Sequence, residues 1–389
     1  MSSFRKFLKA LFILSWIFLF LWSFRGVRLW LHEAVLWTRG FNLAPSGQAP
    51  PEFVPLHRFH PVSRLRPYET ETIPARPRFP TIEIHGHIFR KVPPDFTGAM
   101  DRSHVRYFIN LSGWTKTAAQ YRKLIAKHPS PRILHFVGFH WKHAGKSENF
   151  GRLIAKDLEE VARLGARGVK LWKNFGLKVK DPQGKLIALD DRRLDPVWDV
   201  CAKYRLVVSM HSADPPAFFT PTDRKNERFG ELGRKPQWSF YRPGLPSFKE
   251  LMEQRDRLFK RRRDVTFIAV HFGEYAHDLK KAEKLLKDHP NVILDTAQRI
   301  DELGRQPRAA RKFILRHQDK ILFGTDGPPD FKKSRIYWRF FETRDEYFDY
   351  YPPHKPRKGL WKIHGLGLPD ATLKKLYYDN AARLLRLPR

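Results

Sequence analysis

The sequence predicts an α/β fold of the (β/α)8, or TIM-barrel, class, preceded by an N-terminal membrane-anchor helix and a proline-rich linker. Eight short runs rich in β-branched and aromatic residues alternate with amphipathic stretches from residue 81 onward. The remaining length suits one domain, since barrels of about 250 residues or more commonly form a single unit. No Gly-x-Gly-x-x-Gly pattern follows the first run, which weakens the alternative of an open, doubly wound nucleotide-binding sheet.

The N-terminal segment, residues 1–42, has the pattern of a basic flank and a hydrophobic anchor. Arg5, Lys6 and Lys9 precede an apolar run from Ala10 to Phe24. Such a run covers about 22 Å as a helix, short of a ~30 Å hydrocarbon core, but apolar residues resume soon after it. No small-x-small cleavage site follows, so we expect an uncleaved single-pass anchor, with a cleaved signal peptide or a peripheral helix as alternatives. The flanking cations predict that the N-terminus lies inside and that the domain after the linker lies on the extracytoplasmic side of the membrane.

Residues 43–80 and 81–389 form the other two predicted regions. The first is rich in proline and lacks periodicity, which predicts an extended linker. The second is the barrel, and a long polar stretch within it, Ser212–Pro243, could form a lid over its top. The expected strands are Thr81–His85, Val105–Asn110, Ile133–Phe139, Gly168–Leu171, Leu206–Met210, Val265–Val270, Val292–Asp295 and Ile321–Phe323. The expected helices between them include Thr117–Lys127, Leu153–Leu164, Asp195–Tyr204, Lys249–Arg261 and Ala282–Asp288.

The charge balance is strongly basic, with 73 Lys and Arg against 40 Asp and Glu and a formal net charge of +33. Such a field favours anionic partners, although a general basic bias or a surface suited to an anionic cell envelope explains it as well. The basic residues are scattered, and their longest tight run is only Lys260–Arg263. We therefore expect no specific nucleic-acid binding. The single cysteine, Cys201, excludes an internal disulfide and a four-cysteine metal site.

Polar residues occur where the expected strands end. His85 and His87 end the first strand, His211 follows the fifth, His271 follows the sixth and Asp326 follows the eighth. In a barrel these positions lie together at the carboxyl ends of the strands, where active sites are built. Imidazole nitrogens and a carboxylate suit zinc or a similar transition metal.

Taken in order, these motifs resemble the amidohydrolase superfamily. His-Gly-His on the first strand, lone histidines after the fifth and sixth, and Gly-Thr-Asp after the eighth carry the resemblance. They are most similar to the amidohydrolase-related branch that includes aminocarboxymuconate-semialdehyde decarboxylase. The C-terminal Tyr-Asp-Asn-Ala-Ala-Arg-Leu-Leu, ending at Leu385, resembles the last helix of that branch. The resemblance covers roughly residues 80–388, about four fifths of the chain.

The resemblance implies that one divalent metal ion, with zinc expected, is held by His85, His87, His211 and Asp326. His271 would act as acid or base on water that the metal activates, with Asp326 also taking part in catalysis. The implied activity is hydrolysis of an ester, amide or lactone bond in a small-molecule substrate. A non-oxidative decarboxylase or other carbon–carbon lyase would use the same ligands and is the first alternative. An inactive, membrane-tethered binding protein is the second.

Other residues near the strand ends are candidates for substrate contact or support. Lys170 ends the fourth strand, where binuclear relatives place a carboxylated lysine, so it could bind an acidic substrate or pair with a neighbouring carboxylate. Glu83 stands where the family often has aspartate and could orient a ligand or close the barrel floor. His135, His140 and His143 lie near the third strand, and the mid-strand place of His135 indicates a packing role. The remaining substrate-binding candidates are Trp172, Asn174 and Arg299.

Overall fold

The computed structural model describes residues 63–67, 73–88, 95–112, 115–351 and 358–388. The chain divides into two compact units. The larger comprises residues 65–216, 243–356 and 361–389 and contains every strand described below. The described part of the smaller comprises residues 63–64, 217–242 and 358–360.

Eight parallel strands of the larger unit follow one another in sequence order. They form a run of three, β1 to β3, and a run of five, β4 to β8. The two runs are joined by a parallel bridge between Val137 and Val169, and β1 is joined to the chain after β8 by a bridge between Gly86 and Gly327. A closed eight-stranded barrel results, as the sequence predicts. The strands are Thr81–Gly86, Val105–Asn110, Ile133–His135, Gly168–Leu171, Val207–Met210, Phe267–Ala269, Val292–Asp295 and Ile321–Leu322.

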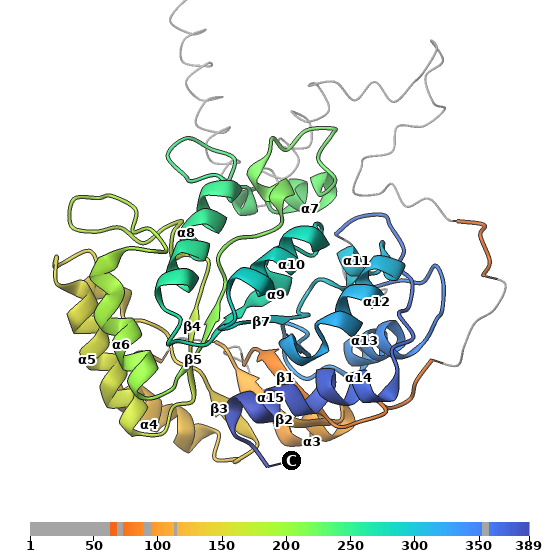
Figure 1. The fold of residues 1–389 in the computed structure, drawn as a ribbon, viewed down its shortest axis with the longest axis horizontal. Coiled ribbons are helices and arrows are strands. Elements are labelled where there is room, and N and C mark those ends of the chain that lie inside the picture. Colours follow the sequence, from red (N-terminus) through yellow and green to blue (C-terminus); the bar gives the residue numbers. More distant parts are fainter. Residues whose placement is uncertain (1–62, 68–72, 89–94, 113–114, 352–357, 389) are drawn as a thin grey trace, which may run out of the picture. The chain divides into compact units, whose positions relative to one another are not determined.

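Helices of the larger unit lie around these strands (Figure 1). Several begin at side-chain caps, such as the capping box of Ser247 and Glu250 at the start of α8. The helices are α3 Phe96–Arg102, α4 Ala118–Lys127, α5 Phe150–Arg163, α6 Asp195–Lys203, α8 Phe248–Arg261, α9 Val270–Gly273, α10 Leu279–Asp288, α11 Ile300–Leu303, α12 Pro307–Arg316, α13 Phe331–Glu342, α14 Asp370–Lys374 and α15 Asn380–Leu385. The five expected helices all exist, with bounds shifted by up to three residues.

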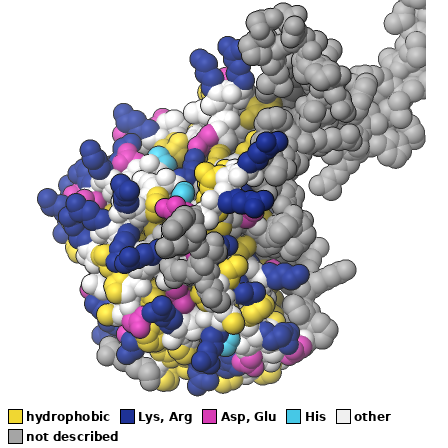
Figure 2. All heavy atoms as spheres, turned by 90° about the vertical axis from the view of Figure 1, so that its right-hand side faces the viewer, with side chains coloured by type: hydrophobic (Ala, Val, Ile, Leu, Met, Phe, Trp, Pro, Cys, Tyr) yellow, Lys and Arg dark blue, Asp and Glu magenta, His cyan; other side chains and the backbone are white. Residues whose placement is uncertain are grey.

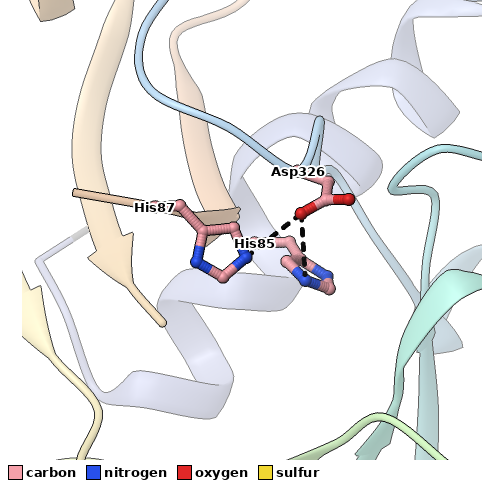
Figure 3. A group of neighbouring side chains, drawn as sticks. All are labelled: His85, His87 and Asp326. Carbon is pink, nitrogen blue, oxygen red and sulfur yellow. Dashed lines mark ion pairs between the residues drawn. The ribbon is translucent and has the colours of Figure 1, made fainter. Parts of the chain in front are cut away.

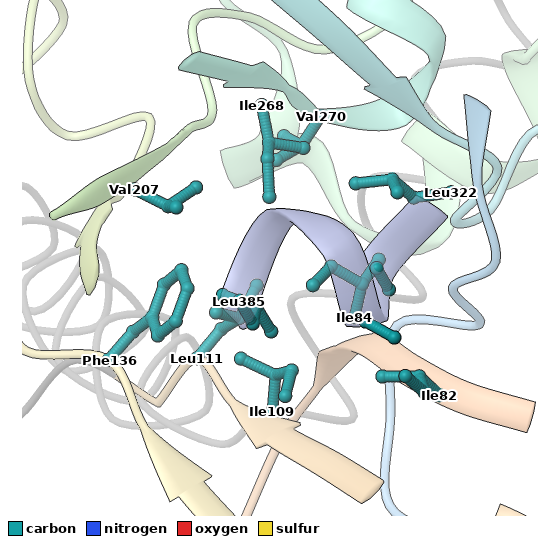
Figure 4. Close-up of a cluster of buried hydrophobic side chains, with 12 residues drawn as sticks. Ile82, Ile84, Ile109, Leu111, Phe136, Val207, Ile268, Val270, Leu322 and Leu385 are labelled. Atoms are coloured by element: carbon teal, nitrogen blue, oxygen red, sulfur yellow. The ribbon is translucent and has the colours of Figure 1, made fainter. Parts of the chain in front are cut away.

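The barrel core contains apolar side chains from the strands and from the C-terminal helix α15. Leu385, Ala381 and Ala382 of α15 join this cluster, and the strand side chains point toward the helix (Figure 4). Asn380 fixes α15 near the start of β8, because its side-chain amide donates to the carbonyl of Ile321 at 2.9 Å. The terminal motif therefore closes the end of the barrel opposite the carboxyl ends of the strands. The other members of the cluster are Ile82, Ile84, Ile109, Leu111, Phe136, Val207, Ile268, Val270 and Leu322.

Some expected elements differ from the structure. β3 ends at His135 and continues only as the single bridge at Val137, and β6 is confined to Phe267–Ala269. Most of the long polar stretch, residues 217–242, belongs to the smaller unit and contains the helix α7 Phe229–Arg234. The lid role of that stretch stays a prediction.

No helix in the described part of the chain is both long and apolar enough to cross a membrane. The expected anchor, residues 1–42, lies outside the described residues, as does most of the linker 43–80. The described end of the linker is attached to the barrel, because Arg335 of α13 donates to the carbonyls of Ile73 and Pro74 at 3.3 and 3.1 Å. Pro77 is buried there.

Basic side chains are distributed over the surface rather than gathered. Figure 2 shows Lys and Arg side chains spread over the described part of one face, interspersed with acidic and apolar ones. This agrees with their scatter along the sequence.

Candidate metal centre

The last residues of β1 bring two buried histidines to the carboxyl end of the barrel. His85 is 1% exposed and His87 is 3% exposed. Gly86 separates them, and a Cβ there would overlap the ring of Phe108, so only glycine fits between the two. Asp326 follows β8, and its backbone N–H donates to the carbonyl of His85 at 3.0 Å.

His85, His87 and Asp326 point toward one another (Figure 3). The distance from Asp326 Oδ1 is 3.1 Å to His87 Nε2 and 3.7 Å to His85 Nε2. Ligands of one tetrahedral ion with bonds of about 2.0–2.1 Å lie about 3.3 Å apart, so these atoms are spaced to hold a single ion. The backbone of Asp326 has a φ of +64°, a left-handed conformation that aspartate tolerates better than most residues.

Asp295, the last residue of β7, orients two of the histidines. Its Oδ2 lies 2.7 Å from His85 Nδ1, and its Oδ1 accepts the backbone N–H of His271 at 2.7 Å. A carboxylate behind a ligating imidazole fixes the ring and leaves Nε2 toward the metal. Burial raises the pKa of Asp295 to about 7, against the opposing charge of Lys170. We did not select Asp295 from the sequence, although it ends the expected strand Val292–Asp295 as the other site residues end theirs.

His271 lies beside the predicted ligands with its backbone in the left-handed region, at a φ of +54°. Its Nδ1 is 2.9 Å from the carbonyl oxygen of Ala297, which must receive an N–H, so Nε2 is the basic nitrogen. Its ring centre is 4.7 Å from that of His85 and 4.4 Å from that of His211. Burial, followed by the neighbouring His211 and Arg299, lowers the pKa of His271 well below its usual range, so the imidazole is neutral.

His211 lies nearer His271 than the predicted ligand set implies. In the described residues, His85, His87 and Asp326 form one group of mutually close ligand atoms, whereas His211 forms another with His271 and Glu274. His211 Nε2 is 3.7 Å from Glu274 Oε1 and 3.6 Å from Asp214 Oδ1. Burial raises the pKa of Glu274 to about 8 despite the opposing charge of Arg299. Glu274 is a second residue that sequence reasoning missed, and its place three residues after His271 gave no distinctive signal.

The predicted substrate-binding residues occupy different places. The Lys170 ammonium is buried 3.2 Å from His85 Nε2, and no carboxylate among the described residues lies within ion-pair distance of it. Burial lowers the pKa of Lys170 to about 8, opposed mainly by Asp295 and Asp326. The ring of Trp172 is 5.2 Å from that of His87, so it borders the centre. Asn174 is exposed.

Arg299 is buried in an ion-pair network rather than aimed at the ligand atoms. Its guanidinium lies 2.7 Å from Glu274 Oε2 and 3.3 Å from Glu302 Oε2. Arg299 therefore contacts Glu274, and Glu274 in turn lies beside His211.

Glu83 and Lys333 hold the two chain segments that carry the predicted ligands. Glu83 Oε1 accepts the backbone N–H groups of His85 at 3.0 Å and Thr325 at 2.9 Å, so it joins β1 to the loop after β8. Lys333 of α13 donates to the carbonyls of Thr325 and, at 3.1 Å, Asp326. Burial raises the pKa of Glu83 to about 7, opposed chiefly by its bonds to Thr325. Glu83 thus has the orienting role that was one of its two expected alternatives, and Lys333 was not predicted.

Comparison with known proteins assigns the chain to a family. A family model described as amidohydrolase matches residues 117–387. The chain belongs to the amidohydrolase family. This confirms the resemblance inferred from the strand-end motifs. The matched residues begin after His85 and His87, so the family model does not cover these two histidines. A 130-residue segment is 29% identical to secreted RxLR effector protein 41 of Plasmopara viticola, covering 33% of this chain and 67% of that protein.

Solved structures similar to this amidohydrolase-family chain share little sequence with it. 2,6-Dihydroxybenzoate decarboxylase from Rhizobium is 15% identical with a TM-score of 0.48, covering 79% of this chain and 98% of that one. A putative amidohydrolase from Staphylococcus aureus is 15% identical with a TM-score of 0.49, covering 79% and 99%. The dihydroxybenzoic acid decarboxylase from Polaromonas sp. JS666, with bound manganese and 2-nitroresorcinol, is 16% identical with a TM-score of 0.47, covering 77% and 87%. Likenesses this distant say nothing about the reaction of this chain.

Proposed function

We propose that this amidohydrolase-family protein is a metal-dependent hydrolase that cleaves an ester, amide or lactone bond of a small-molecule substrate. The observation that supports it is the convergence of His85, His87 and Asp326 at ligand spacing, with the neutral His271 beside them. The donor set fits a divalent transition metal, and zinc is the expected ion. His211 completes the proposed ligand set, although its ring lies closer to His271 and Glu274.

Different residues of the centre take different roles in the proposed hydrolysis. A divalent ion held by these ligands supplies Lewis acidity and lowers the pKa of water from 15.7 to near 7. His271 accepts the proton of the attacking water on Nε2 and returns it to the leaving group. Asp295 and Ala297 keep the rings of His85 and His271 in the orientation this requires. Lys170 and Trp172 border the substrate, and the buried Lys170 ammonium favours one that carries a negative charge.

The metal centre is tested by elemental analysis of the purified full chain after incubation with zinc. His85→Ala should lose one ion per chain relative to the unsubstituted protein, together with activity, while circular dichroism shows the barrel still folded. Removal of the ion by a chelator and its return should abolish and restore activity. Unchanged metal content in both His85→Ala and Asp326→Asn would refute the proposed ligands.

The reaction is tested by screening metal-loaded protein on a panel of esters, amides and lactones, with carbon dioxide release scored in parallel on aromatic and unsaturated carboxylic acids. Hydrolysis that is lost in His271→Ala supports the proposal. Carbon dioxide release without hydrolysis would replace it with the carbon–carbon lyase alternative, which uses the same ligands. Metal binding without turnover on either panel would favour the inactive binding protein.

We also propose that residues 1–42 tether the barrel to a membrane, with the barrel on the extracytoplasmic side. The support is the basic flank, the apolar run Ala10–Phe24 and the missing cleavage site.

A further inference from the structure

Two histidines and an aspartate meet outside the barrel centre, between the loop after β3 and the helix α5. His140 Nδ1 lies 2.8 Å from Asp157 Oδ2, and His143 Nε2 lies 2.9 Å from the same oxygen. The three side chains are each about a quarter exposed, at 26%, 27% and 24%. They are therefore ordered against the protein but open to solvent on one side.

Local structure brings the two imidazoles together. Trp141–His143 form a single 3-10 turn, η3, in which the N–H of His143 donates to the carbonyl of His140 at 3.1 Å. A 3-10 turn has three residues per turn, so positions three apart lie on the same side. The two ring centres are accordingly 4.5 Å apart. Asp157 comes from α5, whose neighbouring Ile154 and Leu158 are buried and fix the helix against the barrel.

The pairing of Asp157 is unusual for this chain. Lys and Arg outnumber Asp and Glu by 73 to 40, yet in the described part of the chain the ion pairs of Asp157 are both with imidazoles. Two imidazole nitrogens and one carboxylate oxygen within 4.8 Å of one another are the donors that zinc and related ions select. Opening the present 2.8 and 2.9 Å spacings to the ~3.3 Å of a tetrahedral ion requires about half an ångström.

We propose that His140, His143 and Asp157 bind a second divalent transition-metal ion, separate from the ion of the barrel centre. The exposed side of the cluster leaves the fourth position to water. The ion has a structural role, because it joins η3 to α5. Trp141 of η3 stacks on Phe175 with ring centres 5.0 Å apart, and Phe175 belongs to the segment after β4 that also carries Trp172. An ion bound by this cluster therefore restrains, through the contact of Trp141 with Phe175, the segment after β4 that borders the barrel centre.

The test measures zinc content and zinc titration of the full chain in a background without the barrel ion, His85→Ala with His87→Ala. This background should retain one ion per chain, and adding His143→Ala should remove it. The matched control is His128→Ala. His128 is half-buried and belongs to none of the clusters of potential metal ligands among the described residues, so this variant should keep the ion. Loss of the ion in the control as well would overturn the proposal, as would a background that binds no zinc.

A second measurement protects the test against misfolding. In the otherwise unsubstituted chain, Asp157→Asn keeps the size and one acceptor oxygen of Asp157, so the hydrogen bonds to both histidines can persist while the ligand charge is lost. This variant should lower zinc content from two ions per chain to one and abolish the rise in thermal midpoint that the second equivalent of zinc produces. In the His85→Ala, His87→Ala background, cobalt in place of zinc should give the visible spectrum of a tetrahedral nitrogen–oxygen site, and adding Asp157→Asn should remove that spectrum. Unchanged zinc content and an unchanged spectrum with Asp157→Asn would contradict the proposal and show that the cluster only hydrogen-bonds the turn Trp141–His143 to α5. These readouts do not involve turnover, so they stand apart from the barrel reaction.

Discussion

Two histidines of the barrel centre, His85 and His271, each bind the protein through Nδ1. His85 turns Nδ1 to Asp295 and Nε2 toward Asp326, and His271 turns Nδ1 to the carbonyl of Ala297. The side of the ring bound to the protein decides which nitrogen is free for chemistry. The roles of single residues can therefore be separated by substitution.

His271→Ala should keep metal content near that of the unsubstituted protein and lower the turnover rate by roughly 10²–10⁴, the usual contribution of a positioned acid or base. Its ring lies 4.7 Å from that of His85, and the ligand atoms of His85, His87 and Asp326 are close to one another without it. Metal content and rate are measured on the same preparations, with His85→Ala as the variant that should lose both. If His271→Ala loses its metal and excess zinc restores the rate, His271 is a ligand instead.

Lys333→Met should weaken zinc binding at the barrel centre by roughly 10–100-fold, as expected for groups that support ligands. Its ammonium holds the carbonyls of Thr325 and Asp326, and methionine keeps the length of the side chain without the donors. Competition with a chromophoric chelator gives the affinity. Lys332→Met, on an exposed neighbour, should leave it unchanged, and equal affinities in both variants would exclude this role for Lys333.

His135 should make stability depend on pH. Burial, with a smaller effect of His128, lowers its pKa from 6.5 to about 4. In the unfolded chain, His135 therefore binds a proton below about pH 6.5, whereas in the folded chain it stays neutral down to about pH 4. The free energy of unfolding falls as the pH falls between these two values, because the unfolded chain then binds more protons than the folded chain. One pKa unit is worth about 1.4 kcal/mol, so the loss approaches about 3 kcal/mol. Urea unfolding from pH 7.5 to 4.5 should show a smaller slope for His135→Gln, and parallel curves would contradict this.

Among elements, the start of α5 approaches the backbone just before α6 so closely that a side chain would prevent the contact. Gly151 in the first turn of α5 faces the carbonyl of Arg193, and a Cβ at that position would overlap it. Gly151→Ala should therefore lower the free energy of unfolding by roughly 1–3 kcal/mol, the cost of overpacking. Gly145→Ala is the matched control, since nothing lies near its Cβ position. Thermal and urea midpoints compare the two, and equal midpoints would show that α5 shifts without cost.

For the whole molecule, the full chain should be recovered with membranes, retain its N-terminus and be released only by detergent. A chain that begins at Ile73 should be soluble and keep the zinc content of the full chain, because it preserves the carbonyls of Ile73 and Pro74 that Arg335 binds. Fractionation followed by N-terminal sequencing measures both. A mature protein that starts after residue 25 would show that the segment is a cleaved signal.

The sequence by itself determined the barrel and the strand-end positions of His85, His87, His211, His271 and Asp326. Hydrophobic runs with a strand-like length report burial directly, and the residue after each run must lie at the carboxyl end of the barrel. His135 was predicted to pack, and it is 4% exposed with Asn110 3.0 Å from its ring. These inferences depend only on local pattern and chain order.

Only the tertiary structure decided which of these groups touch. The contacts of Asp295 with His85, of Lys333 with Asp326 and of Glu274 with Arg299 join residues from different strands and helices, and no local pattern encodes such pairs. The same holds for His140, His143 and Asp157, where a 3-10 turn and a helix meet. The ends of the strands show where a site can form. The distances of 3–4 Å between the side chains of that site depend on the twist of the sheet, the course of the loops and the packing of the helices. These are properties of the complete fold.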